Sequence, residues 1–178
     1  MNPEELIHKY YAGQPELEHI LLTHSRLVAK KALSIADRHP ELEVDRQFLY
    51  EAAMLHDIGI VLTDAPAIEC RGKEHYLRHG LLGAELLRKE GLPMHARVAE
   101  RHTGTGLTAE AIREKGLPLP ERDFRPETTE EQIICYADKF YSKTRLEVEK
   151  TPEQAMKSLE RFGSQGVKRF REWMKRFE

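Results

Sequence analysis

Four side chains that can bind a metal ion stand in order along the chain, each within or at the end of an apolar stretch. They are His24, the adjacent pair His56 and Asp57, and Asp138. Burying such polar groups without partners is costly, so their apolar surroundings point to a shared function. Two imidazoles and two carboxylates suit a hard to borderline divalent cation, without selecting among Fe, Mn, Mg, Co, Ni and Zn. We therefore expect one or two divalent ions of undetermined identity.

Helices are the elements predicted to position these ligands. The clearest begins after Pro15, where apolar residues recur at helical spacing. His24 lies three, four or seven positions from each of these residues, so it shares their face and points inward. The residues that define this face are Leu17, Ile20, Leu21, Leu27 and Val28.

Two further helices are predicted to deliver the other ligands. One starts at Asp45 as its N-cap, ends with His56 and Asp57, and has Gly59 as its C-terminal stop. The other carries Asp138 and runs over about 128–146, because Thr128-Thr129-Glu130-Glu131 forms a capping box.

The rest of the chain also follows a helical pattern. A first helix is predicted to start at Asn2, others to cover about 74–90, 93–102 and 108–115, and two more to lie within 151–178. No segment alternates as a strand would. We therefore predict a single all-α domain over 1–178, with a core of about 20–146 and C-terminal helices packed on it. The proline-containing loop 116–126 is either a substrate lid or a plain surface loop.

The ordered set His24, His56-Asp57 and Asp138, with Ile58-Gly59 completing the central motif, resembles the HD superfamily of metal-dependent phosphohydrolases. The resemblance covers about residues 20–146. It implies an all-helical bundle in which these four residues hold the metal.

Two more histidines sharpen the resemblance. His79 and His102 are similar to the extra histidines of HD subfamilies that hold two metals. There they would complete the shell of the second ion, with Asp57 bridging the two, since a carboxylate has two oxygens to offer. The resemblance thus implies catalytic roles for Asp57, His79 and His102. The remaining histidines match no motif position and are assigned to surface or packing: His8, His19, His39, His75 and His95.

Substrate-binding residues are sought among nearby cations. Arg145 follows Asp138 by seven residues, which on one helix is two turns along the same face. It could therefore reach a phosphate, or instead pair with Glu149. Lys139 and Lys73 are the other predicted phosphate ligands, whereas Arg78, Arg101 and Lys143 are available but cannot be ranked.

Composition excludes several classes of protein. The 178 residues carry 28 Lys and Arg against 30 Asp and Glu, for a net charge of −2, which argues against a nucleic-acid partner. The longest apolar run is too short for a membrane span, and the acidic N-terminus does not resemble a signal peptide. Cys70 and Cys135 form no closely spaced pair, which favours free thiols and a cytoplasmic protein.

Such a site predicts hydrolysis. A divalent ion lowers the pKa of bound water toward ~7, and paired ions can clamp phosphoryl oxygens. We therefore expect a metal-dependent phosphohydrolase that cleaves a phosphoester or phosphoanhydride of a nucleotide or small phosphorylated metabolite. Two alternatives remain open: a symmetrical dinucleoside-tetraphosphate hydrolase, whose family pattern includes an Ala-Asp helix ending in Arg, and a catalytically weak regulatory module that binds nucleotides. The sequence does not predict the oligomeric state.

Overall fold

The computed structural model describes residues 1–178 and contains nine α-helices. Their bounds are α1 Pro3–Tyr11, α2 Pro15–Arg38, α3 Arg46–Leu55, α4 His79–Lys89, α5 Pro93–Glu100, α6 Ala109–Glu114, α7 Thr129–Asp138, α8 Pro152–Leu159 and α9 Ser164–Phe177. Short 3-10 turns join several of them, at Pro40–Leu42, Ile58–Leu62, Pro66–Ile68, Tyr76–Arg78 and Glu160–Phe162. The predicted all-α fold is confirmed.

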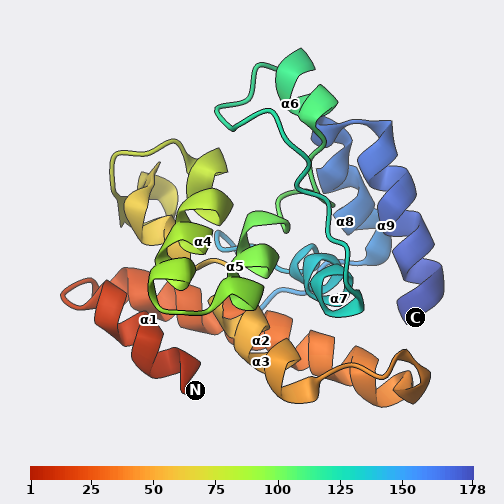
Figure 1. Ribbon diagram of the computed structural model, residues 1–178, viewed down its shortest axis with the longest axis horizontal. Coiled ribbons are helices and arrows are strands. Elements are labelled where there is room, and N and C mark those ends of the chain that lie inside the picture. Colours follow the sequence, from red (N-terminus) through yellow and green to blue (C-terminus); the bar gives the residue numbers. More distant parts are fainter.

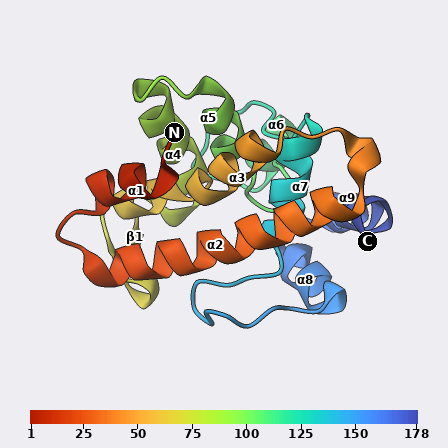
Figure 2. The same ribbon diagram turned by 90° about the horizontal axis from the view of Figure 1, so that it is seen from below.

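The helices form a bundle around α7. The long helix α2 runs along one side of the molecule with α3 packed on it (Figure 2). The pair α4 and α5 lies on one flank of α7, and α8 and α9 lie on the other (Figure 1). Helix α7 contacts α2, α3, α5 and α9, so the residues at its C-terminal end face the middle of the bundle.

The predicted helix starts agree with the structure because their capping residues act locally. The Asn2 side chain accepts from Glu4 N at 3.1 Å, and Asp45 accepts from Phe48 N at 3.0 Å. Thr128 and Thr151 each form the reciprocal capping box that opens α7 and α8. Each cap satisfies a backbone N–H that the helix itself leaves without a partner.

Gly59 was predicted as the stop of α3, and this is wrong. The helix ends at Leu55, with His56 as its C-cap, and Gly59 lies inside the following 3-10 turn. Its lack of a side chain serves packing instead. A Cβ at Gly59 would lie 2.1 Å from the carbonyl oxygen of His79. The glycine thus allows this turn to touch the backbone of α4.

The prediction that the helix of Asp138 runs to about residue 146 is also wrong. Helix α7 ends at Asp138 itself. Beyond it, Ser142 Oγ accepts from Thr144 N at 3.2 Å, a local side-chain bond that competes with helix formation. Phe140 turns into the core, where it is 2% exposed. Arg145 therefore does not lie two helical turns along the face of Asp138.

Smaller differences occur between α3 and α5. The helix predicted over 74–90 begins only at His79, after a 3-10 turn over Tyr76–Arg78. The helix predicted over 93–102 ends at Glu100. Two strands of two residues each, β1 Asp64–Ala65 and β2 Cys70–Arg71, pair antiparallel in the intervening connection.

The C-terminal helices share the main hydrophobic core. Phe170, Trp173 and Phe177 of α9 are buried, and the ring of Phe170 lies 4.9 Å from that of Tyr136 on α7. No helix of the chain combines the length and the apolar character that crossing a bilayer requires.

Candidate metal centre

Six side chains from five segments of the chain converge in the middle of the bundle. They form two groups that share Asp57, and within each group one possible ligand atom per residue lies within 4.8 Å of every other. The first group is His24, His56, Asp57 and Asp138, and the second is Asp57, His79 and His102. All six side chains belong to buried residues. The structure therefore brings together every residue predicted to bind metal.

The carboxylate of Asp57 is divided between the two groups. Its Oδ2 lies 3.1 Å from His24 Nε2 and 3.0 Å from His56 Nε2. Its Oδ1 lies 3.3 Å from His79 Nε2 and 3.1 Å from His102 Nε2. Each oxygen thus faces one pair of imidazoles, as a bridging carboxylate would.

Three of the imidazoles are oriented by the main chain. The Nδ1 atoms of His56, His79 and His102 lie 2.6 to 2.7 Å from the carbonyl oxygens of Ala53, Tyr76 and Ala99. In each case the acceptor belongs to the residue three positions earlier, at the end of a helix or turn. A carbonyl only accepts, so Nδ1 carries the proton, and Nε2 faces the centre as the potential ligand. His24 lies inside α2, and its buried Nδ1 has no hydrogen-bond partner in the protein.

The spacing of the donor atoms fits a divalent ion. Ligand atoms ~2.1 Å from one ion lie about 3.0 Å apart in octahedral and about 3.4 Å apart in tetrahedral geometry. In the first group, Asp138 Oδ1 lies 2.9 Å from His24 Nε2 and 3.3 Å from His56 Nε2. In the second group, the Nε2 atoms of His79 and His102 lie 3.0 Å apart. Because both rings carry their proton on Nδ1, two lone pairs face each other there, an arrangement that a cation between them would stabilise.

Charge and burial set opposite protonation states within the centre. Burial lowers the pKa of His102 to about 4. Burial also disfavours charge on His56, but the carboxylates of Asp57 and Asp138 together outweigh it and raise the pKa of His56 to about 9. For Asp57 and Asp138 burial opposes ionisation, yet neighbouring ammonium and imidazole groups hold both pKa values well below their usual range. The carboxylates are therefore charged and available as ligands.

Two lysines contact the ligand carboxylates. Lys139 Nζ donates to the carbonyl oxygen of His102 at 2.8 Å and also pairs with Asp138. Lys143 Nζ forms an ion pair with Asp57 Oδ2 at 2.6 Å. Burial would lower the pKa of Lys143, but Asp57, Tyr76 and Asp138 together raise it well above its ordinary value. The sequence alone does not distinguish Lys143 from the other nearby cations, because only the course of the chain after α7 brings it to the centre.

The other predicted phosphate ligands lie elsewhere. Arg145 is exposed beyond the end of α7, and Glu149, its predicted alternative partner, pairs with Lys31 at 2.9 Å. Lys73 is exposed in the connection after β2, and its side chain forms no ion pair with the centre. The helix that was to carry Arg145 to a phosphate does not exist.

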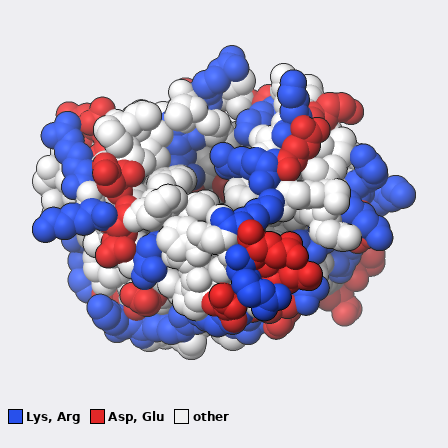
Figure 3. Space-filling model, turned by 90° about the horizontal axis from the view of Figure 1, so that it is seen from above, with Lys and Arg blue, Asp and Glu red and all other residues white.

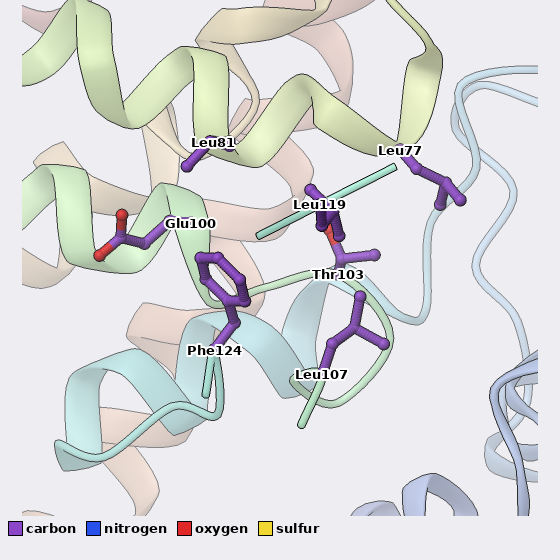
Figure 4. Close-up of a pocket in the computed structure, with 7 residues that line it drawn as sticks. All are labelled: Leu77, Leu81, Glu100, Thr103, Leu107, Leu119 and Phe124. Carbon is purple, nitrogen blue, oxygen red and sulfur yellow. The ribbon is translucent and has the colours of Figure 1, made fainter. Parts of the chain in front are cut away.

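The loop 116–126 packs beside the second group. Its residues Leu119 and Phe124 face Leu81 of α4 and Leu107 across a small apolar cavity (Figure 4). The cavity has a volume of about 10 Å³, enough for a single water molecule. The loop is held by a hydrogen bond from Phe124 N to Leu107 O at 2.8 Å. It therefore covers the segment that follows His102.

One face of the molecule carries both basic and acidic side chains (Figure 3). It is hollowed near its centre, and Lys and Arg side chains gather around the hollow (Figure 3). Cations around a concave surface attract anionic ligands.

Comparisons with known proteins agree with this geometry. The family model of the HD domain matches residues 21–142. A tRNA (cytidine(56)-2'-O)-methyltransferase of Picrophilus torridus is 36% identical over 128 residues, which are 71% of this chain and 33% of that protein. An uncharacterized protein of Methanocaldococcus jannaschii is 35% identical over 129 residues, 71% of this chain and 69% of that protein. The chain thus spans about a third of the methyltransferase.

Solved structures show the same fold. The HD domain of the L. monocytogenes phosphodiesterase PgpH superimposes with a TM-score of 0.55 at 21% identity, covering 94% of this chain and 93% of that one. The same domain in complex with cyclic-di-AMP gives a TM-score of 0.54 at 20% identity, with 94% and 92% coverage. The helical bundle, the ordered His and Asp residues and the family match over most of its length lead to one conclusion: the chain belongs to the HD domain family.

Proposed function

We propose that the chain is a metal-dependent phosphohydrolase that acts on a nucleotide or another small phosphorylated metabolite. The observation that carries the proposal is the division of Asp57, whose two oxygens face two separate pairs of imidazoles. Two adjoining groups of ligands joined by one carboxylate are typical of centres that hold two ions for phosphoryl chemistry.

The residues of the chain have distinct roles in this proposal. His24, His56, Asp57 and Asp138 hold one ion, while His79, His102 and Asp57 hold a second. Bound ions would supply Lewis-acid activation of water and of the phosphate. The main-chain carbonyls keep three imidazoles aimed at the centre, and Lys139 ties Asp138 to the segment of His102.

The alternatives differ in what they require. Hydrolysis of a symmetrical dinucleoside tetraphosphate loses one of its supports, since Arg145 does not lie on the helix of Asp138. A regulatory module would bind nucleotides without turnover, but it would not need a complete set of six ligands. The methyltransferase activity named for one relative belongs to a protein of which the matched residues make up only 33%, and methylation is not part of the proposal.

The proposal is tested by reconstituting the protein with Mn²⁺, Fe²⁺, Co²⁺, Ni²⁺, Zn²⁺ or Mg²⁺ and screening aryl phosphoesters, nucleotides and dinucleoside polyphosphates. We expect phosphate release from at least one class of substrate and two ions per chain. Asp57→Asn should lower both the metal content and the rate, the rate by about 10³-fold. The matched control is His19→Ala, which removes an exposed histidine outside the centre. Nucleotide binding without hydrolysis under every metal would instead establish the regulatory module.

A further inference from the structure

Lys143 differs from the other cations near the centre in its position and in how many acceptors its ammonium group already contacts. Its ammonium group lies 2.6 Å from Asp57 Oδ2, and its side chain is only 12% exposed. Lys139 is already held by two acceptors, the carbonyl of His102 and the carboxylate of Asp138. Lys143 has a single ion-pair partner, so its three N–H groups are not all committed.

Lys143 lies in a loop, residues 140–150, whose two ends are joined by a hydrogen bond. Lys150 N donates to Phe140 O at 2.8 Å, which ties the two ends of the segment 140–150 together. Lys31 contacts both ends of the loop: its Nζ pairs with Glu149 at 2.9 Å and lies 3.9 Å from the centroid of the Phe140 ring. Loops with closed ends are compact and often functional. Here the loop returns the ammonium group of Lys143 to the centre, while the next two residues, Thr144 and Arg145, are exposed.

Lys143 contacts the one carboxylate that the two ligand groups share, at the oxygen that faces His24 and His56. Asp57 is the junction of the two groups because it belongs to both. A phosphoryl group acted on by both groups must lie beside this junction. The ring of Tyr76, which stacks on His79 with centroids 4.7 Å apart, has its centroid 6.0 Å from Lys143 Nζ and walls the same side. An ammonium group is a point charge with rotatable donors, suited to a tetrahedral phosphate at close range.

We propose that Lys143 is the phosphate-recognising residue of this site and that it contacts an oxygen of the phosphate that reacts. The role of Lys143 in a reaction rests on the proposed hydrolase function. Its contact with phosphate can be measured by binding alone, without any hydrolysis. It replaces Arg145 and Lys73, whose side chains lie outside the centre. Lys139 is then a positioning residue that holds Asp138 and the segment of His102.

The test compares Lys143→Met and Lys143→Arg with the wild type and with Lys150→Met. Lys150 lies on the same loop and its side chain forms no ion pair, so its substitution controls for loss of one positive charge. Three quantities are measured: the Mn²⁺ content after dialysis, the affinity of the Mn²⁺-loaded protein for inorganic phosphate by calorimetry, and kcat and KM with p-nitrophenyl phosphate.

We expect Lys143→Met to keep the wild-type Mn²⁺ content and to bind phosphate at least about 10-fold more weakly. Lys143→Arg should recover most of that affinity because it keeps the charge, and Lys150→Met should match the wild type. The assignment is overturned if Lys143→Met binds phosphate as the wild type does. It is also overturned if that variant loses Mn²⁺, since Lys143 would then only position Asp57. Thermal melting shows whether each variant is folded, and Lys143→Gln replaces Lys143→Met if the latter is not.

Phosphate binding requires no turnover, so the two proposals can fail separately. Phosphate affinity that depends on Lys143 in a protein that hydrolyses nothing would refute the hydrolase function and support the assignment. Hydrolysis by the wild type, with phosphate affinity unchanged in Lys143→Met, would refute the assignment alone.

Discussion

His56 and His102 face the same carboxylate, yet they hold protons differently. His102 has a pKa of about 4 and is neutral near pH 7, with its proton on Nδ1 and its Nε2 free. His56 has a pKa of about 9 and carries two protons at that pH in the absence of metal. A metal ion must therefore displace a proton from the first group of ligands but not from His102.

The first prediction concerns this proton. We expect metal binding at pH 7.5 to release about one proton per chain through His56, and affinity to rise about tenfold per pH unit up to about pH 9. The direction follows from the raised pKa. Protonation of His56 stabilises the metal-free fold below its unfolded pKa, and this contribution is lost as the pH rises through about 9. Calorimetry of Mn²⁺ binding in buffers of different ionisation enthalpy measures the release. An affinity that does not change between pH 7 and 9 would show that His56 is already neutral.

The six candidate metal ligands could be predicted from sequence, but the lysine that reaches Asp57 could not. All six predicted ligands converge, because each lies in a local motif whose helix face or helix end fixes its direction. Lys143 was among the available cations but could not be ranked, and the expected continuation of the helix of Asp138 favoured Arg145 instead. On such a helix, a residue five positions after Asp138 would lie on a different face, whereas Arg145 would lie on the same one.

The end of α7 differs from the predicted one because the end of a helix depends on competition between local and distant contacts. No proline or glycine follows Asp138 for many residues, so the sequence contains no strong stop signal there. The helix ends because Phe140 is buried in the core and Ser142 bonds the backbone of Thr144. Caps such as Asp45 and Thr128 were predictable because a side chain and a nearby N–H are sufficient to form them.

Helix α4 approaches α5 so closely that the contact fixes a ligand. A Cβ at Gly80 would lie 2.5 Å from the carbonyl oxygen of Ala99. That same oxygen accepts the Nδ1 proton of His102 at 2.7 Å. The absence of a side chain on one helix thus keeps in place the acceptor that orients an imidazole at the end of the next.

The second prediction follows from this contact. Gly80→Ala should displace the carbonyl of Ala99, reduce the metal content from two ions to one, and lower the free energy of unfolding by about 1–3 kcal/mol. Urea denaturation and metal analysis measure the two effects. Gly83→Ala should be milder, because its nearest atom would lie at 3.0 Å, and Glu85→Ala at an exposed position of α4 should change neither quantity. If Gly80→Ala still bound two ions, the close contact of α4 with α5 would not be what keeps His102 in position to bind metal.

The whole molecule is organised around one main core, to which the C-terminal helices contribute. Phe170 and Phe177 are fully buried, and Trp173, the single tryptophan, is 6% exposed. The rings of Phe170 and Phe177 contact Tyr136 on α7, and the ring of Phe170 also contacts Phe140 just beyond that helix. A single domain over 1–178, as predicted, should therefore unfold as one unit, with the C-terminal helices losing their structure together with the rest.

The third prediction is that the chain unfolds in one cooperative step. The fluorescence of Trp173 reports on α9, whereas far-UV circular dichroism reports on all helices, and the two transitions in urea should coincide. Phe170→Ala should shift both together, with a loss of about 3–5 kcal/mol, because it leaves a cavity in the core. Met94→Ala, at a position that is 49% exposed, is the control. A fluorescence transition that precedes the circular dichroism transition would show that the C-terminal helices form a separate unit.

The carbonyls of Ala53, Tyr76 and Ala99 determine which mutations would disturb this centre. In many metal sites a side chain orients each histidine, and one substitution can remove it. Here the orienting groups belong to the peptide backbone, so every amino acid supplies them. Losing these carbonyl acceptors requires an insertion or a deletion rather than a substitution. A single-residue insertion or deletion near the end of α3 or α5 would rotate an imidazole away from the centre, whereas substitutions that leave the packing intact would not.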